Sequence, residues 1–494
     1  MNSEEVVATE VLIAGAGPVG LMLAGELRLA GVEVIVLERL DEPTGESRGL
    51  GFTARTLEVF DQRGLLSRFG DIQVTDLGHF GGLPVDFSVL GTPHAGGAKA
   101  VPQSDTEAML EAWAGELGAG IRRGHSVVGL EEDADGVTVE AENASGRMRF
   151  RAKYLVGADG GRSFVRKAAG FDFPGTASTQ EMFLGDVKGA DIQTRMIGET
   201  LPGGMVMAGP LGDGVFRIIV CERGTEPKKR DAPPSWDEVS SAWERLTGQD
   251  ISGGTPLWLS AFGNAARLAT EYRRGRVLLA GDAAHIHLPA GGQGMNTGVQ
   301  DAVNLGWKLA AVTKGTAPDT LLDTYHDERH AVGVRLLMNT QAQGLLFLSG
   351  DEVQPLRDVM KELITFDVVS KHLAGMVSGL AIDYGSGPGE HPLVGLRMPD
   401  VELVGAEGKT RTSTLLRSGR GVLLDLGEGL AAQGWADRVD VVVAFPHELG
   451  PDNALEGIGA LLIRPDGHVA WAAPGPVALP QALERWFGPA IPEN

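Results

Sequence analysis

A glycine-rich turn close to the start of the chain constrains the fold more than any other feature. In the segment EVLIAGAGPVGLMLAGELRLAGVEVIVLER, an apolar strand runs into the turn GAGPVG, a helix follows, and a second strand ends at Glu38. Gly15 permits a tight turn, Gly17 lets the backbone approach a pyrophosphate, and Gly20 lets the helix pack closely on the strand. The acid at position 38 can accept a hydrogen bond from a ribose 2′-OH and would repel the 2′-phosphate of NADP. The segment therefore predicts a βαβ unit that binds FAD or NAD.

Two later strands end in a similar way. The segment RAKYLVGADGGRSFVRKAAG places Asp159 among glycines after an apolar strand, and RGRVLLAGDAAHIHLPAGGQGMNTG places Asp282 directly after a glycine. In an open α/β sheet, a carboxylate at such a strand end can reach the hydroxyls of a ligand. For Asp159, an Asx-type turn before a surface helix is an equal alternative. On these residues alone, the glycine-rich turn that contains Asp282 could serve another phosphate, a metal, or the far end of one long ligand.

The histidines and the cysteine do not favour a metal site. His285 and His287 lie two residues apart and have no third ligand nearby in the sequence, whereas zinc sites usually need three or four. We expect both histidines to pack beside the turn. Cys221 is the only cysteine, which excludes an intrachain disulfide and any multi-cysteine metal or redox site.

The length and charge of the chain narrow the class of protein. A chain of 494 residues is long enough for two to four domains. Its net charge of -22 opposes binding to nucleic acid or to anionic lipid. No apolar run approaches the roughly 18–20 residues of a membrane span, and the start MNSEEVVATE lacks the features of a signal peptide. We therefore expect a cytoplasmic protein that binds small molecules.

Taken together, the three turns resemble those of the flavoprotein aromatic hydroxylases, the single-component FAD monooxygenases of the p-hydroxybenzoate hydroxylase type. The resemblance lies in GAGPVG, GADGGRSFVR and GDAAHIHLPAGGQGMNTGVQDAVNLGWKLA, which are spread over the first two-thirds of the chain. It implies that the first turn holds the FAD pyrophosphate, that Asp282 holds the ribityl chain, and that residues 289–296 line the isoalloxazine ring. The second glycine-rich turn would then serve the far end of the same FAD.

The resemblance also implies further cofactor contacts. Arg48, in ESRGLGFTARTLEVF, would reach and seat the flavin, and Gln103, in VPQSDTEAML, would lie near it; the alternatives are a surface arginine and a polar residue at a helix entry. A helix from about Thr297 would direct its positive end at the N1–C2=O edge of reduced flavin. No catalytic acid or base is expected. The expected cofactor-binding residues are Gly15, Gly17, Val19, Gly20, Glu38, Arg39, Arg48, Gln103, Asp159, Asp282, Pro289, Gly292, Gly294, Met295 and Asn296.

The rest of the chain divides into a middle and a C-terminal part. Short alternating stretches such as GVFRIIVCER in residues 173–272 predict an inserted antiparallel sheet that binds the substrate. Residues 391–494, with the stretch RPDGHVAW, resemble a thioredoxin-like C-terminal domain without Cys-X-X-Cys. The expected fold is thus α/β, with a discontinuous Rossmann-like FAD-binding domain in residues 1–172 and 273–390. Candidate apolar pocket residues, each of them individually better suited to the core than to a pocket wall, are Phe183, Met205, Met207, Phe216, Trp258 and Phe262.

Within the family, the sequence is most similar to the bacterial aromatic polyketide hydroxylases of angucycline, anthracycline and tetracycline-like intermediates. The expected function is NAD(P)H- and O2-dependent hydroxylation of a polycyclic aromatic substrate through a flavin C4a-hydroperoxide, with NADPH as the preferred, transiently bound donor. The alternatives are Baeyer–Villiger oxygenation, hydroxylation of a simple phenol, a flavin dehydrogenase or halogenase, and a flavoprotein that does not oxygenate. The exact substrate, the regiochemistry and the formation of a homodimer stay open.

Overall fold

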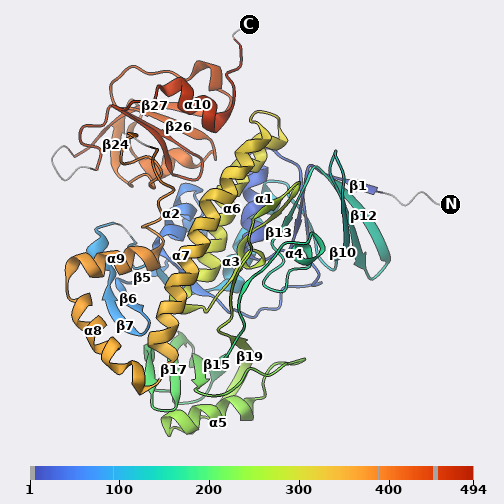
Figure 1. The fold of residues 1–494 in the computed structure, drawn as a ribbon, viewed down its shortest axis with the longest axis vertical. Coiled ribbons are helices and arrows are strands. Elements are labelled where there is room, and N and C mark those ends of the chain that lie inside the picture. The colour runs from blue at the N-terminus through green and yellow to red at the C-terminus, as the bar shows by residue number, and fades with distance from the viewer. Residues whose placement is uncertain (1–5, 93, 388, 449–453, 493–494) are drawn as a thin grey trace.

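The computed structural model describes residues 6–92, 94–387, 389–448 and 454–492. At its centre lies a six-stranded sheet of order β21-β22-β13-β2-β3-β9, which is parallel except for the edge strand β21 (Figure 1). Strands β2, β13 and β22 are short apolar runs that are completely buried, as strands covered on both faces should be. The bounds are β2 (Val11–Ala14), β3 (Val34–Leu37), β9 (Gly120–Arg122), β13 (Tyr154–Gly157), β21 (Arg273–Arg274) and β22 (Val277–Leu279).

Three helices pack together beside this sheet. Helix α1 (Pro18–Leu29) contacts both α3 (Gln103–Glu116) and α6 (Gln293–Thr313). The sequence predicted α6 from about residue 297, but the helix begins four residues earlier. The two glycines before it, Gly291 and Gly292, have φ of +69° and +67° and complete the turn within two residues.

Smaller sheets extend the first 170 residues. A four-stranded sheet contains β1 (Val6–Ala8), β10 (Ser126–Glu132), β11 (Val137–Asn143) and β12 (Gly146–Ala152). Two further sheets consist of β4 (Leu50–Phe52), β5 (Gln73–Val74) and β8 (Ala98–Pro102), and of β6 (Leu77–Phe80) and β7 (Leu83–Asp86). Helix α2 (Ala54–Gln62) lies within this region, and α4 (Phe164–Ala168) follows β13. The sequence analysis did not anticipate these sheets.

The middle of the chain forms the predicted antiparallel layer. Five strands pair in the order β16-β17-β18-β15-β19, and α5 (Trp236–Thr247) packs on one face of them. A three-stranded sheet of β14 (Gly175–Thr176), β20 (Ala266–Leu268) and β23 (His285–Ile286) joins this layer to the central part. The five strands are β15 (Glu181–Lys188), β16 (Arg195–Leu201), β17 (Gly204–Gly212), β18 (Val215–Glu222) and β19 (Thr255–Gly263).

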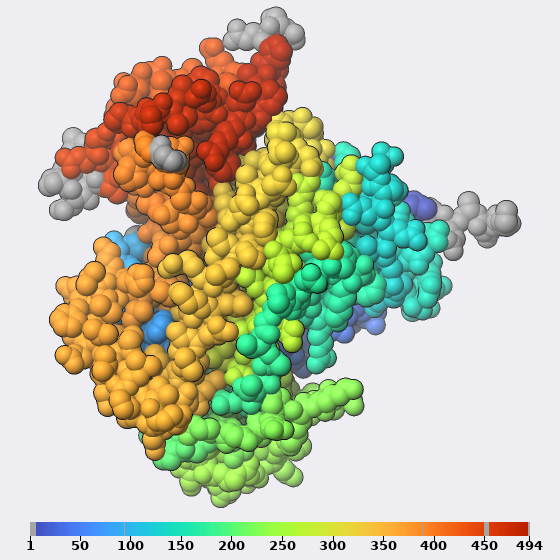
Figure 2. Space-filling view, viewed as in Figure 1, coloured from blue at the N-terminus to red at the C-terminus, as the bar shows by residue number. Residues whose placement is uncertain are grey.

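Three more helices and a separate sheet complete the chain. The helices are α7 (Asp323–Leu348), α8 (Gln354–Ile364) and α9 (Asp367–Ser378). The last sheet has the order β25-β24-β27-β26-β28-β29 and is followed by α10 (Leu479–Phe487). It lies at the opposite end of the molecule from the middle layer, with α6 and α7 between the two (Figures 1 and 2). Its strands are β24 (Glu402–Gly405), β25 (Gly408–Arg411), β26 (Gly421–Asp425), β27 (Val439–Pro446), β28 (Ala460–Ile463) and β29 (Val469–Ala473).

Two further properties bear on the expectations from the sequence. Among the described residues, no helix combines the length and the apolar character that crossing a bilayer would require. The Cys221 thiol is buried, and burial raises its pKa to about 11, so that it is protonated at neutral pH and unsuited to act as a nucleophile.

Candidate functional site

The three turns singled out in the sequence lie along one edge of the central sheet. They follow β2, β13 and β22, which are neighbouring parallel strands, so all three turns emerge at the carboxyl ends. Glu38 follows β3, the next strand on the other side. The order across the edge is therefore Glu38, the turn 15–20, Asp159 and Asp282. Carboxyl strand ends are where open α/β sheets bind their ligands, and this row is suited to an elongated one.

The first turn has the features required to bind a pyrophosphate. A Cβ atom on Gly20 would lie 2.0 Å from the carbonyl oxygen of Gly15, so only glycine permits this close packing of helix on strand. Gly17 precedes α1 without a side-chain cap, and a Cβ there would meet no atom within 4 Å. The N–H groups at the start of α1 thus face open space with the positive end of the helix dipole behind them.

The two residues predicted to serve the adenosine half differ in their surroundings. The Glu38 carboxylate accepts hydrogen bonds from the backbone N–H groups of Ala16 (2.9 Å) and Leu40 (2.9 Å), which fixes it against the first turn. Each of its oxygens keeps a second lone pair for a ribose hydroxyl. Arg39 is exposed and makes no hydrogen bond or ion pair to any residue that the structure describes.

Asp159 has a structural role, and its predicted contact with the cofactor stays a prediction. Its Oδ2 atom accepts from the N–H groups of Phe164 (2.7 Å) and Val165 (3.0 Å) and so caps the short helix α4. This is the turn-forming alternative that the sequence left open. Its Oδ1 atom is buried and finds no partner among the described residues. Its backbone lies against the first turn, because a Cβ on Gly15 would be 3.1 Å from the Asp159 Cα.

The first and third turns are in direct contact. Val19 of the first turn fills the space beside two glycines: a Cβ on Gly281 would lie 2.8 Å from a Val19 methyl, and one on Gly298 only 2.5 Å from it. Gly281 also has a φ of +62°, which favours glycine. One ligand can therefore contact both turns, and the third turn needs no separate phosphate or metal to explain it.

Asp282 is poised to bind a ligand. Its side chain is accessible to solvent and has no hydrogen-bond or ion-pair partner among the described residues. The surrounding protein nevertheless raises the pKa of this carboxyl by desolvation, while His285 and Arg48 act in the opposite direction and Asp301 adds to the rise. The carboxylate is therefore free to accept hydrogen bonds from ligand hydroxyls.

A buried ionic cluster that the sequence analysis missed supports the third turn from behind. Asp301 on α6 accepts from the Gly281 backbone N–H (3.1 Å), from Arg329 Nε (2.6 Å) and bonds His285 Nε2 (2.7 Å). Burial raises the pKa of Asp301, but Arg329 and His285 outweigh it and leave the pKa lowered, so the carboxylate is ionised. His285 thus packs beside the turn, as predicted. The described residues contain no group of three or more side chains able to hold a metal ion.

The segment expected along the flavin ring leads into helix α6. Gly292 is its left-handed N-cap residue and supplies no side chain, so the first N–H groups of α6 have no side-chain cap. Asn296 holds this end in place by accepting from the Thr53 N–H (2.9 Å) and donating to the Gly292 carbonyl (2.8 Å). Pro289 is exposed, and Gly294 lies beside the His287 ring. Burial lowers the pKa of His287 to about 4, so that ring is neutral.

Gln103 holds the loop that carries Arg48. Its side-chain oxygen accepts from the Gly49 backbone N–H (3.1 Å), and the backbone N–H of Gln103 donates to Ser47 Oγ (2.5 Å). A Cβ on Gly49 would also be 3.6 Å from the Met295 methyl, which places this loop beside the start of α6. Arg48 is exposed and bonds none of the described residues, yet its charge acts on Asp282. Gln103 thus contacts the Arg48 loop and also serves as the predicted polar residue at a helix entry.

The middle layer turns one face toward this site. The side chains of Met205, Met207 and Phe262 belong to one apolar cluster on this face. They pack there with Leu288 and Ala290, which precede α6, and with Phe347 at the end of α7. Phe183 and Phe216 point the other way and pack with α5, because neighbouring residues of a strand face opposite sides. Two of the six predicted pocket residues therefore belong to the core beneath the layer, as the alternative reading allowed.

Polar groups on the same side were also missed by the sequence analysis. Asp186 holds Arg217 through two hydrogen bonds (2.8 and 2.9 Å) and accepts from Trp258 Nε1 (2.8 Å), while Arg217 Nη1 is buried without a partner among the described residues. Burial, and then the charge of Lys99, lower the pKa of His79 to about 4. No motif in the sequence singles out Lys99. The residue after it, Ala100, has a φ of +57°, which is strained for a residue other than glycine.

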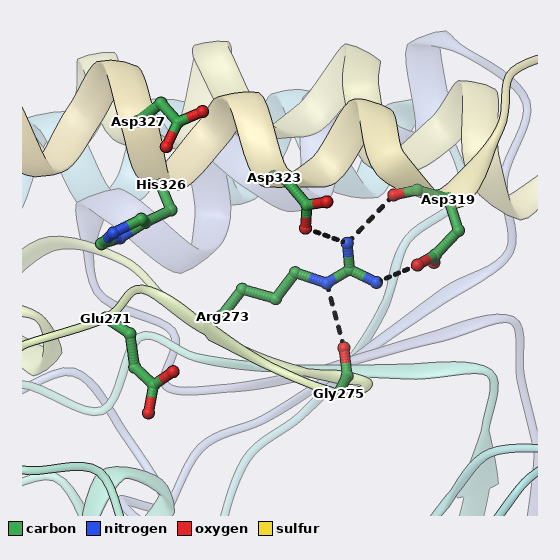
Figure 3. A pocket seen from close by; sticks show the side chains of 7 residues that line it. All are labelled: Glu271, Arg273, Gly275, Asp319, Asp323, His326 and Asp327. Atoms are coloured by element: carbon green, nitrogen blue, oxygen red, sulfur yellow. Dashed lines mark hydrogen bonds and ion pairs between the residues drawn. The ribbon is translucent and has the colours of Figure 1, made fainter.

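A pocket of about 390 Å³ elsewhere on the surface does not belong to this site. It is lined by Glu271, Arg273, Gly275, Asp319, Asp323, His326 and Asp327 (Figure 3). Arg273 donates to Asp319 and Asp323 within it, so its main charges are already paired. Residues 273–275 precede β22, whereas the three turns follow their strands. The pocket therefore lies at the amino ends of the parallel strands, opposite to the three turns.

Two family models match the chain, one over its first two-thirds and one over its C-terminal part. Residues 8–340 match the model of a family described as FAD binding domain, and residues 391–490 match one described as aromatic-ring hydroxylase, C-terminal. The 12-dehydrotetracycline 5-monooxygenase/anhydrotetracycline 6-monooxygenase of Streptomyces rimosus is 45% identical over 97% of this chain and 99% of its own length. Dialkyldecalin synthase of Streptomyces rugosporus is 42% identical over 97% and 99%.

Solved structures agree with these matches. The crystal structure of CabE, an aromatic hydroxylase from angucycline biosynthesis, superimposes with a TM-score of 0.95 at 63% identity, covering 98% of this chain and 99% of CabE. The similarity therefore extends over the middle layer and the C-terminal sheet as well as over the glycine-rich turns.

Proposed function

The chain belongs to the aromatic-ring hydroxylases with an FAD-binding domain, and from this premise we propose that it hydroxylates a polycyclic aromatic polyketide with NAD(P)H and O2. The main support is the row of groups across the central sheet. The open N-terminus of α1, the unpaired Asp282 and the uncapped start of α6 follow one another along one edge, with the apolar face of the middle layer above the last of them. These residues fit FAD, which has a pyrophosphate, a ribityl chain and a ring in that order.

When bound, FAD would supply the redox chemistry, in which NAD(P)H gives two electrons, one atom of O2 enters the substrate and the other leaves as water. The chain positions and shields this chemistry. The N–H groups of α1 hold the pyrophosphate, Asp282 accepts from the ribityl hydroxyls, and the start of α6 stabilises negative charge on the reduced ring. Arg48 adds a positive charge beside the ring, and Met205, Met207 and Phe262 exclude water.

The substrate class is inferred from the relatives and from the apolar face that the middle layer turns toward the site. The similar proteins are named for tetracyclines and for angucycline biosynthesis, whose compounds are fused aromatic ring systems bearing oxygen. An apolar wall with few polar groups suits such rings. Asp186 and Arg217 on this side are joined by two hydrogen bonds, so each charge is already neutralised by the other.

A second candidate is a flavoprotein that rearranges its substrate without adding oxygen. It is favoured by the 42% identity to a dialkyldecalin synthase, a name that describes no oxygenation. Baeyer–Villiger oxygenation of a polyketide and hydroxylation of a simple phenol are further alternatives within the family's chemistry.

The test is to incubate the FAD-loaded protein with NADPH, 18O2 and a panel of angucyclinones and anthracyclinones. We expect a product that gains one 18O atom, with an added aromatic hydroxyl by NMR. A ring-expanded lactone would instead indicate the Baeyer–Villiger reaction, and a product isomeric with its substrate would favour the second candidate. Turnover of the substrates with no 18O in any product would refute the proposal. A reaction without NADPH serves as the control.

The finer organisation is proposed on the same basis. We assign residues 1–172 and 273–390 to the FAD-binding domain, 173–272 to substrate binding and 391–494 to a thioredoxin-like domain. The last assignment is supported by the parallel pair β26–β27 joined to an antiparallel hairpin and followed by α10. Lacking cysteine, that domain has no thiol chemistry. Preference for NADPH, and formation of a homodimer, stay predictions for kinetics and sedimentation.

A further inference from the structure

The hairpin β28–β29 of the C-terminal domain inserts charged residues between helices of the FAD-binding domain. Arg464 donates to Glu328 of α7 through Nη1 (2.5 Å) and Nη2 (2.8 Å). Asp466 pairs with Arg464 and accepts from Asn304 Nδ2 (3.1 Å) on α6. All of these groups are buried. The only turn of this hairpin is therefore fixed by ionic contacts to the two helices that lie behind the cofactor site.

A continuous set of contacts leads from this hairpin to the third turn. Tyr384 stacks against His468, with ring centroids 4.2 Å apart, and the Arg464 guanidinium lies 5.2 Å from its ring centre. The Tyr384 hydroxyl accepts from Arg329 Nη1 (3.2 Å). Arg329 in turn donates to Asp301 (2.6 Å), which accepts from the backbone N–H next to Asp282.

Such an arrangement is costly unless each position is fixed. Buried ion pairs lose hydration, and their net contribution to stability is often small compared with an apolar core of the same volume. What they supply is a defined geometry, since the hydrogen bonds hold each buried donor to particular acceptors on the neighbouring elements. Arg329 adds a contact to the Thr297 carbonyl (3.1 Å), so it holds both the turn and the first part of α6.

We propose that the C-terminal domain positions the FAD site through this relay, with Tyr384, Arg329 and Asp301 as positioning residues that fix the third turn and the start of α6. The inference rests on the FAD site proposed above. Because coupling between two sites is reciprocal, FAD binding should also stabilise the hairpin, although the hairpin is remote from the cofactor. The relay gives the C-terminal domain a role in cofactor retention that needs no cysteine.

The first test compares two tyrosine variants in the full-length apoprotein. Tyr384→Phe removes the hydroxyl that bonds Arg329 and leaves the ring in place. Tyr154→Phe is the matched control, because it also removes a hydroxyl bonded to a charged residue, Asp319 (2.8 Å), but at the opposite edge of the sheet. Titration of apoprotein with FAD, followed by flavin fluorescence, should show roughly 2- to 30-fold weaker binding for Tyr384→Phe and no change for Tyr154→Phe. Equal affinities for both variants would overturn the proposal, whatever their melting temperatures.

The second test measures the reciprocal effect. Hydrogen exchange of the hairpin amides in residues 460–473 is followed with and without saturating FAD. We expect FAD to slow this exchange in the wild type and in Tyr154→Phe, and to slow it much less in Tyr384→Phe. Exchange in the wild-type hairpin that does not respond to FAD would also overturn the proposal. A wild type that binds no FAD would refute the proposed function itself, and that result is seen before any variant is compared.

Discussion

Removal of the Asp282 carboxylate should separate cofactor binding from stability. Asp282→Ala deletes a carboxylate that makes no hydrogen bond or ion pair to any of the described residues, so only its longer-range attraction to His285 and Arg48 is lost with it. Because desolvation raises the pKa of this carboxyl, its ionised form is unfavourable in the fold, and Asp301 repels it further. We therefore expect the apoprotein variant to have an unfolding free energy equal to or above that of the wild type.

The effect on FAD should be large and of opposite sign. An ionised carboxylate that accepts one or two ribityl hydroxyls contributes about 1.5–3 kcal/mol for each hydrogen bond. At about 1.4 kcal/mol per factor of ten, the dissociation constant of FAD should rise by roughly 10- to 10⁴-fold. Asp282→Asn, which keeps hydrogen-bonding capacity and loses the charge, should fall between the wild type and the alanine variant.

The assay is titration of apoprotein with FAD by fluorescence, beside urea unfolding of the same apoprotein samples. Wild-type FAD affinity in Asp282→Ala would refute the assignment of the third turn to the ribityl chain. A loss of stability that matches the loss of affinity would instead show that Asp282 supports the fold.

Three further perturbations address other parts of the site. Gly17→Val should abolish FAD binding and leave the apoprotein folded, because the Gly17 backbone has φ -80° and open space where the side chain would go; an FAD-saturated variant would show that this turn is only structural. Arg48→Ala should keep FAD but lower coupled turnover roughly 10- to 100-fold, measured as NADPH consumed against product formed; unchanged coupling would make Arg48 an ordinary surface arginine. Lowering the pH from about 6.5 to 5 should reduce the unfolding free energy, by at most ~1.4 kcal/mol per pH unit for each histidine concerned. Burial holds the pKa of His79 and His287 at about 4 and that of His468 at about 3, against an ordinary 6.5, so the unfolded chain binds protons that the folded chain does not. Urea titrations at several pH values test this, and a stability that does not change between pH 7 and 5 would contradict it.

Short motifs of the sequence predicted where the strands and turns at this end of the sheet lie, and the cofactor roles of their residues stay predictions. The glycines of the first turn and the carboxylates that follow strands 154–157 and 277–279 are set by short-range patterns, and the structure places them as a row. Strand order made this possible, since each motif carries its own strand and parallel strands bring their carboxyl ends to one edge. The antiparallel middle layer was predicted from alternation, which gives the faces of a strand but not which face meets the flavin.

Residues that act across the fold were not predicted. Asp301, Arg329 and Tyr384 are separated by 28 and 55 positions, and none belongs to a short motif. Their role depends on helix packing, which single-sequence periodicity does not specify. Asp159 shows the opposite case, because its Oδ2 atom forms the local turn that the sequence offered as an alternative, while its contact with the cofactor stays a prediction. The start of α6 was misplaced because two left-handed glycines shorten the turn.

The central claim is that a single FAD extends along the strand ends from Glu38 to the start of α6. A crystal structure of the FAD complex tests it most directly. We expect the adenosine ribose beside Glu38, the pyrophosphate at the N-terminus of α1, the ribityl chain on Asp282 and the ring between Arg48 and residues 289–296. A flavin bound elsewhere, or one whose ribityl chain passes Asp282 without contact, would contradict it.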